Sequence, residues 1–171
     1  ISSPRILHKT DARAVITNIN DKKTPGDARE ELSGKIKKMK LGSDRNTTIQ
    51  IQKQIPAGIE LIVGMKRDPS FGPVYLFGAG GILAELIGDK NLTLEPMSER
   101  AIRDLIESSK VSRLLTGYRG EAPKNIPALR RLIGSLSALA AIPEIEEVTL
   151  NPVIVTEDNA WAVDARILIT R

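Results

Sequence analysis

Residues 147–169 read EVTLNPVIVTEDNAWAVDARILI, and this stretch decides the fold expected for the C-terminal part of the chain. Two runs rich in valine and isoleucine flank residues 156–159, TEDN, which are all residue types that favour turns. Such a layout is typical of two strands joined by a short loop. The sequence therefore predicts a C-terminal β-hairpin.

The register of this hairpin follows from its loop. If Val155 pairs with Ala160, Asn151 lies directly opposite Asp164 on the neighbouring strand. Because side chains alternate between the faces of a strand, one face of the hairpin becomes wholly apolar and is predicted to face the core. That face consists of Val148, Leu150, Pro152, Ile154, Trp161, Val163, Ala165 and Ile167. The other face carries Asn151 and Asp164 next to Thr149 and Arg166.

The pair formed by Asn151 and Asp164 has two interpretations. An amide oxygen beside a carboxylate suits Mg²⁺, which takes a few protein oxygens and fills its other positions with water and phosphate. The alternative is an ordinary cross-strand polar pair on a solvated sheet face. The hairpin by itself favours the polar pair.

Composition restricts the class of protein. With 171 residues, 41% hydrophobic and 27% charged, the chain can bury one substantial core. It contains no cysteine, which excludes disulfides, thiolate zinc sites and cysteine nucleophiles and favours the cytoplasm. No apolar run reaches membrane-spanning length. Ile1 is not a start methionine, so we expect one domain of a longer protein.

The net charge of the chain is +4, and its basic residues are densest at residues 35–40, KIKKMK. This cluster is typical of a solvated helix end, where cations complement the helix dipole. The alternative is nucleic-acid binding, but aromatic residues make up only 3% of the chain and leave few side chains for base stacking. We expect no specific nucleic-acid partner; the basic balance also suits anionic ligands such as nucleotides and CoA.

The remaining pattern predicts alternating strands and helices without internal repeats or linkers, which favours one α+β unit. Residues 24–41 and 126–142 are predicted as helices, the first capped by Thr24, and a further helix is capped by Ser98. Expected strands or extended segments are residues 14–19, 48–54, 59–67, 74–77 and 92–96, and shorter helices are residues 82–87 and 111–117.

Three further features are candidates for chemistry. Gly78, Ala79, Gly80 and Gly81 stand between a strand and a helix, an order that either presents backbone amides to a phosphate or simply makes a tight turn. Arg119, between glycines, can hold an anionic oxygen or pair with Glu121. His8 is the only histidine, and a lone histidine is usually structural or merely exposed.

Five segments in order carry a family resemblance: SPRILHKTD at 3–11, IPAGIELIVGMKRDPSFGP at 55–73, LFGAGGILAEL at 76–86, LLTGYRGEAP at 114–123, and LNPVIV with AVDARI at the end. The chain resembles the ATP-grasp module of NDP-forming acyl-CoA synthetases, relatives of the succinyl-CoA synthetase β subunit. The resemblance implies a partial ATP-grasp fold of α+β class, with a mixed or antiparallel central sheet, flanking helices and the C-terminal hairpin. Residues 1–171 would then be a single domain fragment lacking its N-terminal lobe.

The resemblance also implies the reaction acyl-CoA + ADP + phosphate ⇌ acid + CoA + ATP, through an acyl phosphate and a phosphohistidine. The cofactors would be ATP or ADP and Mg²⁺. The partner would be a CoA-binding module, either an α subunit or a domain of the same chain, in a hetero- or homo-oligomer without membrane contact. By position, Asn151 and Asp164 match the metal ligands of the family, and His8 matches a second phosphate-carrying histidine. The adenine pocket is matched by Gln52, Lys53 and Gln54. The surroundings of the phosphate or the travelling histidine are matched by Arg67, Gly78, Gly80, Gly81 and Arg119.

Three departures from the family pattern leave an alternative open. Thr149 stands where the family has an acidic residue that orients the phosphohistidine, and residues 92–94, LTL, replace a basic residue. In the family, a region that would precede Ile1 supplies a phosphate-binding lysine, and we expect these 171 residues to lack it. The alternative function is a degenerate nucleotide-binding or regulatory module, for example one fused to an acyltransferase.

Overall fold

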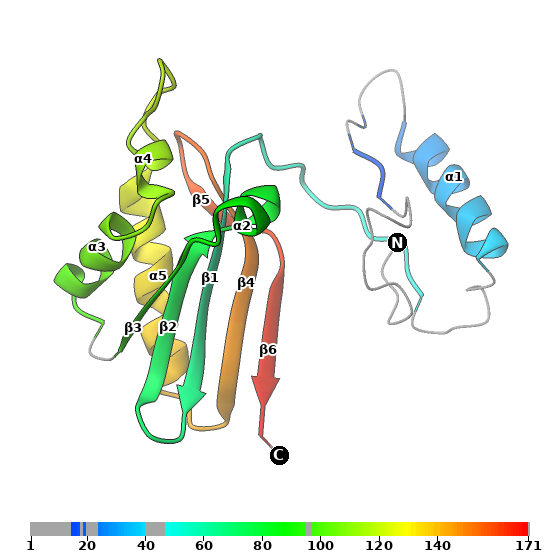
Figure 1. Cartoon of the computed structure of the whole chain (residues 1–171). Helices are drawn as coiled ribbons and strands as arrows, with labels where there is room; N and C mark the ends of the chain where they lie inside the picture. Colours follow the sequence, from blue (N-terminus) through cyan, green and yellow to red (C-terminus); the bar gives the residue numbers. More distant parts are fainter. Residues whose placement is uncertain (1–14, 18, 20–23, 40–46, 95–96, 171) are drawn as a thin grey trace. The chain divides into compact units, whose positions relative to one another are not determined.

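The computed structural model describes residues 15–17, 19, 24–39, 47–94 and 97–170 (Figure 1). The chain separates into two units, Ile1–Gln54 and Ile55–Arg171. In the described residues, no helix is long and apolar enough to cross a membrane.

The first unit contains helix α1, Pro25–Lys38. Its start is as predicted: the Thr24 hydroxyl accepts from the Asp27 N–H at 3.2 Å, and the Asp27 carboxylate accepts from the Thr24 N–H at 3.0 Å, which completes a capping box. Lys35, Lys37 and Lys38 lie in the last turn, as expected of a helix end.

The two strands predicted in this unit are not formed by the described residues. Residues 15–17 and 19 have no strand structure, and in residues 48–54 only Thr48 makes a single β bridge. The alternation of residues 48–54 indicates an extended chain, but a strand also needs a hydrogen-bonded neighbour, which local periodicity cannot supply.

The second unit is built on a six-stranded antiparallel sheet, in keeping with the expected fold class. Its strands are β1 (Ile59–Asp68), β2 (Gly72–Ala79), β3 (Lys90–Leu94), β4 (Ile145–Val155), β5 (Ala160–Ala162) and β6 (Ala165–Ile169). Their order is β3-β2-β1-β4-β5, and β6 also pairs with β4 (Figure 1). The predicted hairpin is thus β4 followed by β5 and β6.

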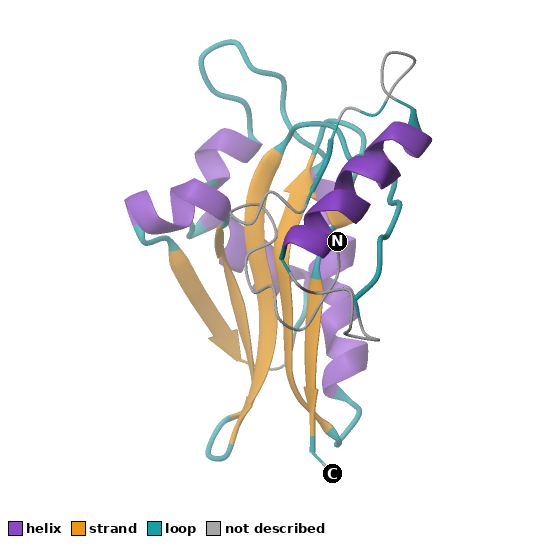
Figure 2. Cartoon of the chain, turned by 90° about the vertical axis from the view of Figure 1, so that its right-hand side faces the viewer, coloured by secondary structure: helices purple, strands orange, loops and turns teal. Residues whose placement is uncertain are grey.

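Four helices complete this unit: α2 (Gly81–Ile87), α3 (Glu99–Glu107), α4 (Ser112–Leu115) and α5 (Ile126–Ala140). Helices α3, α4 and α5 lie on one face of the sheet, which we call the core face (Figures 1 and 2). The core between them contains Leu61, Val63 and Met65 of β1, Tyr75 and Phe77 of β2, Ile102, Leu105 and Ile106 of α3, and Leu129, Ile133 and Leu136 of α5. The opposite face, here the far face, carries the alternate β1 residues Glu60, Ile62, Gly64 and Lys66.

A β-bulge in β4 changes the predicted division of the hairpin. Leu61 of β1 pairs with Val153, whereas Val63 pairs with Leu150, so Asn151 and Pro152 together oppose the single residue between them. Beyond the bulge the alternation shifts by one residue. Val148 and Leu150 face the core as predicted, but Val153 and Val155 are fully buried there in place of Pro152 and Ile154, for which the prediction was wrong. The prediction of burial was also wrong for Val163, Ala165 and Ile167, which are exposed.

Candidate functional site

The register predicted for the hairpin is confirmed. Val155 pairs with Ala160, and Leu150 pairs with Ala165 on β6. Between these pairs, the Asn151 N–H donates to the Asp164 carbonyl oxygen at 3.1 Å. Asn151 and Asp164 therefore lie directly opposite each other, beside the bulge, and both are exposed to solvent.

The donor set at this pair fits a hard cation. The pair offers an amide oxygen and a carboxylate, and one carboxylate oxygen of Asp164 already accepts from the Ala165 N–H at 2.9 Å, which restrains the side chain. Mg²⁺ is commonly held by one or two carboxylates plus water and phosphate. Within the described ranges no group of three or more His, Cys, Asp or Glu side chains is arranged to hold a metal. Any magnesium bound here would thus depend on other oxygens, as a nucleotide would provide.

The glycine turn, residues 78–81, lies at the same end of the sheet. Gly78 pairs with Ile62 of β1, and Ile62 faces the bulge that contains Asn151. Since adjacent strands lie about 4.8 Å apart, the β2 and β4 backbones are separated by about 10 Å in this row. The structure therefore brings two of the predicted site elements together.

The glycines of this turn are required by close backbone approaches. The Gly80 N–H donates to the Glu60 carbonyl oxygen at 2.8 Å, and a Cβ on Gly80 would lie 2.8 Å from the backbone carbon of Leu61. A Cβ on Gly78 would collide with the carbonyl oxygen of Asp89, and one on Gly81, at φ 54°, with the carboxylate of Glu60. These contacts support the tight-turn interpretation. They also place a carboxylate beside the turn, so a phosphate there would need a cation to offset the repulsion.

The Arg119 loop, residues 115–124, extends from this end of the second unit. Its ends are joined by a hydrogen bond from the Lys124 N–H to the Leu115 carbonyl oxygen at 2.9 Å, and Asn125 is tied to the hairpin loop through the Thr156 carbonyl oxygen at 2.8 Å. Arg119 has φ 53°, which is uncommon for a residue with a side chain. Its guanidinium lies over the Tyr118 ring at 5.3 Å, while the Glu121 carboxylate lies 3.6 Å from the Lys124 ammonium rather than pairing with Arg119.

Arg67 occupies a different place. It pairs with Pro73 near the β1–β2 turn, about 20 Å along the strand from the glycine turn. Its guanidinium donates to the carbonyl oxygens of Ala140 at 2.8 Å and Ile142 at 3.3 Å, at the C-terminal end of α5. Arginine is suited to these otherwise unsatisfied carbonyls. The contact is structural, and Arg67 is not part of the candidate site.

Two predicted groups lie outside the second unit. Gln52, Lys53 and Gln54 belong to the first unit, where they are exposed and lie outside helices and strands. His8 lies outside the described residues. The adenine-pocket and phosphate-carrying roles of these residues remain predictions.

Sequence reasoning missed a carboxylate next to the Thr149 departure. The Thr149 hydroxyl donates to a carboxylate oxygen of Glu147 at 3.2 Å. Thr149 pairs with Gly64, and Glu147 pairs with Lys66, so both lie on the far face. The spacing of two residues along a predicted strand could have revealed this carboxylate.

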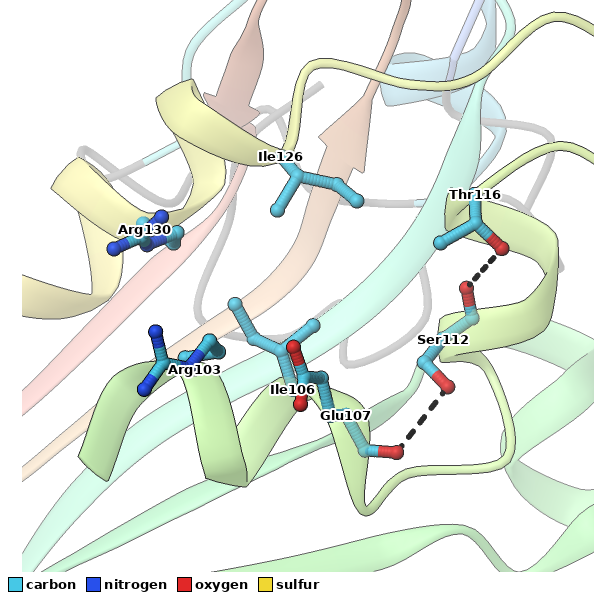
Figure 3. A pocket seen from close by; sticks show the side chains of 7 residues that line it. All are labelled: Arg103, Ile106, Glu107, Ser112, Thr116, Ile126 and Arg130. Atoms are coloured by element: carbon cyan, nitrogen blue, oxygen red, sulfur yellow. Dashed lines mark hydrogen bonds between the residues drawn. The ribbon is translucent and has the colours of Figure 1, made fainter. Parts of the chain in front are cut away.

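The described residues also line a pocket elsewhere, between α3, α4 and the first turn of α5 (Figure 3). It is lined by Arg103, Ile106, Glu107, Ser112, Thr116, Ile126 and Arg130. Its volume of about 140 Å³ is below the 300–1,000 Å³ of ordinary ligand sites. It lies among the helices, away from the Asn151–Asp164 pair, and is not part of the candidate site.

Comparisons with known proteins agree with this fold. A family model described as an ATP-grasp domain matches residues 1–169. The chain is 39% identical to the beta subunit of acetate–CoA ligase (ADP-forming) I of Pyrococcus furiosus, over 99% of this chain and 73% of that subunit. It is 34% identical to acetate–CoA ligase (ADP-forming) I of Archaeoglobus fulgidus, of which it spans 24%.

A solved structure is similar over almost the whole chain. It is dinucleotide forming acetyl-coenzyme A synthetase 1 of Ca. Korarchaeum cryptofilum, in complex with coenzyme A and Mg-AMPPCP, with a phosphohistidine segment pointing towards the nucleotide binding site. The TM-score is 0.84 at 34% identity, covering 99% of this chain and 74% of that chain. The fold and the family match define an ATP-grasp domain. The chain belongs to the ATP-grasp family of the ADP-forming acid–CoA ligases.

Proposed function

We propose that this chain is the nucleotide-handling part of an ADP-forming acyl-CoA synthetase. In the proposed reaction, acyl-CoA, phosphate and ADP are converted to the free acid, CoA and ATP. The observation that carries the proposal is the placement of the Asn151–Asp164 pair and the glycine turn at one end of the sheet. The nucleotide complex of a structure at 34% identity supports it.

The step assigned to this chain is phosphoryl transfer. The bond between phosphorus and a histidine nitrogen breaks, a bond to a terminal oxygen of ADP forms, and the imidazole leaves with the electron pair. Asn151 and Asp164 would hold a magnesium ion, which when bound neutralises phosphate charge so that two anionic groups can approach. Gly78, Gly80 and Gly81 allow the tight backbone turn that would lie beside the phosphate, and Arg119 would present a further cation.

The remaining roles lie outside the second unit. Gln52, Lys53 and Gln54 would line the adenine pocket, and His8 would carry the phosphoryl group between sites. A CoA-binding module, as a separate α subunit or a domain of the same chain, would form the acyl phosphate, and the whole enzyme would be an oligomer. We place this activity in the cytoplasm, where CoA esters and nucleotides are available.

Thr149 favours a second candidate, a degenerate nucleotide-binding or regulatory module. The two candidates differ in whether the protein forms ATP from ADP, because only the synthetase would do so. Calorimetry on the full-length parent protein should show ADP binding that requires Mg²⁺, and an assay with the CoA-binding module should show ATP formation. Binding without turnover would favour the degenerate module. Absence of magnesium-dependent ADP binding would refute both.

A further inference from the structure

Asp89 is a buried carboxylate for which the proposed reaction has no use. It follows Gly88, the C-cap of α2, and precedes β3, and it is 4% exposed. A buried carboxylate is stable only when hydrogen bonds replace its hydration. Asp89 accepts three: from the Lys110 N–H at 3.0 Å, from the Val111 N–H at 2.9 Å and from the Asn91 side-chain amide at 3.0 Å.

The main chain of Asp89 is joined to the glycine turn. Its carbonyl oxygen accepts from the Ala79 N–H at 3.2 Å. The same oxygen is packed against Gly78, where even a methyl group would collide with it. A shift of Asp89 is therefore passed directly to the turn, because there is no side chain between them to absorb it.

The carboxylate of Asp89 is joined to the root of the Arg119 loop. Val111 is the N-cap of α4 and is fully buried. Its N–H is one of the donors to the Asp89 carboxylate. The carbonyl oxygen of Val111 accepts from the Leu115 N–H at 3.3 Å, and the Leu115 carbonyl oxygen accepts from the Lys124 N–H at 2.9 Å, which closes the loop. Asp89 thus lies between the glycine turn and the loop that presents Arg119.

We propose that Asp89 is a positioning residue that sets the glycine turn and the Arg119 loop in a fixed relation for phosphoryl transfer. The inference rests on the proposed function, because it assumes that both elements face the nucleotide phosphates. Asp89 touches neither substrate nor cofactor in this role. Its carboxylate is required because two backbone N–H groups of one turn point at its two oxygens, and a neutral amide offers only one acceptor oxygen.

The test compares Asp89→Asn with a matched control, Ser109→Ala, in the full-length enzyme with its CoA-binding module. Ser109 lies in the same turn, is 4% exposed, and donates its hydroxyl to the Ile106 carbonyl oxygen at 2.7 Å. Both variants lose a buried hydrogen bond, but only Asp89→Asn weakens the connection between the start of α4 and the residue whose backbone carbonyl holds the glycine turn. We expect Asp89→Asn to lower kcat by about tenfold to a hundredfold, as a displaced catalytic group does. Ser109→Ala should keep the wild-type kcat at a similar loss of Tm.

Hydrogen exchange on the wild-type enzyme provides a second measurement if Asp89→Asn does not fold. Binding of Mg-ADP should increase the protection of the Lys110 and Val111 amides, which donate to Asp89. Equal effects of the two variants on kcat, or unchanged protection of these amides when Mg-ADP binds, would overturn the inference. Failure of the wild type to bind Mg-ADP in calorimetry would instead refute the proposed function, and with it the premise on which the role of Asp89 rests.

Discussion

Asn151 lies directly opposite Asp164, joined by a hydrogen bond of 3.1 Å from its N–H to the Asp164 carbonyl oxygen, at the position where a bulge interrupts β4. Bulges redirect side chains and are common beside active sites. Here the bulge sits on a strand that pairs with β1 on one side and with β5 and β6 on the other. Hydrogen-bonded strands on both sides restrain the backbone of Asn151, which makes the Asn151–Asp164 pair suitable for a metal.

Asp164→Asn should weaken divalent-metal binding in the presence of ADP by about tenfold or more, because a carboxylate ligand is replaced by a neutral amide. Titration of the full-length protein with Mn²⁺, followed by electron paramagnetic resonance, measures this directly. Asp158→Asn is the matched control, since Asp158 is exposed in the loop of the same hairpin. Equal weakening by both changes would point to general electrostatics instead of a site.

Gly80→Ala should destabilise the protein by about 1–3 kcal/mol, the usual cost of adding a methyl group where there is no room. The added Cβ would lie 2.8 Å from the Leu61 backbone. Gly34→Ala provides the contrast, because Gly34 lies within α1 and nothing lies within 4 Å of an added Cβ. It should stabilise the helix by about 0.5–1 kcal/mol. Thermal denaturation of both variants should shift Tm in opposite directions.

Arg67→Gln should lower stability without changing the KM for ADP. The guanidinium contacts carbonyl oxygens at the end of α5, and hydrogen bonds from a charged group contribute about 1.5–3 kcal/mol. Lys66→Gln, at the adjacent exposed position, serves as the control for loss of charge. A raised KM for ADP in Arg67→Gln at unchanged Tm would restore the phosphate role that the sequence implied.

Arg119→Gly should separate stability from activity. Glycine adopts the observed φ of 53° without steric cost, so Tm should stay the same or rise. Loss of the guanidinium should lower kcat by about 10²–10³-fold, as the loss of one charge-stabilising donor does in other enzymes. Arg113→Gln, an exposed arginine of α4, tests whether any nearby positive charge has the same effect. An unchanged kcat in Arg119→Gly would remove this residue from the site.

Parts of the fold and the geometry of the Asn151–Asp164 pair could be predicted from local signals. The Thr24 and Ser98 caps, the order of strand, glycines and helix around residues 78–81, and the pairing of Asn151 with Asp164 are all confirmed. Each depends on residues close together in the chain, where spacing alone restricts the geometry. Residues 48–54 show the limit of such signals, because their alternation predicts a strand, whereas among them only Thr48 makes a single β bridge.

The sequence by itself determined the hairpin, its register and the family, because the turn-forming residues and the order of the motifs can be read directly from it. Only the tertiary structure decided which hairpin residues face the core, because the bulge at Asn151 and Pro152 arises from pairing with β1, a strand distant in sequence. It also decided that Arg67 binds the end of α5 and that Asp89 joins the glycine turn to α4. These contacts form between segments that only folding brings together, and no local pattern records them.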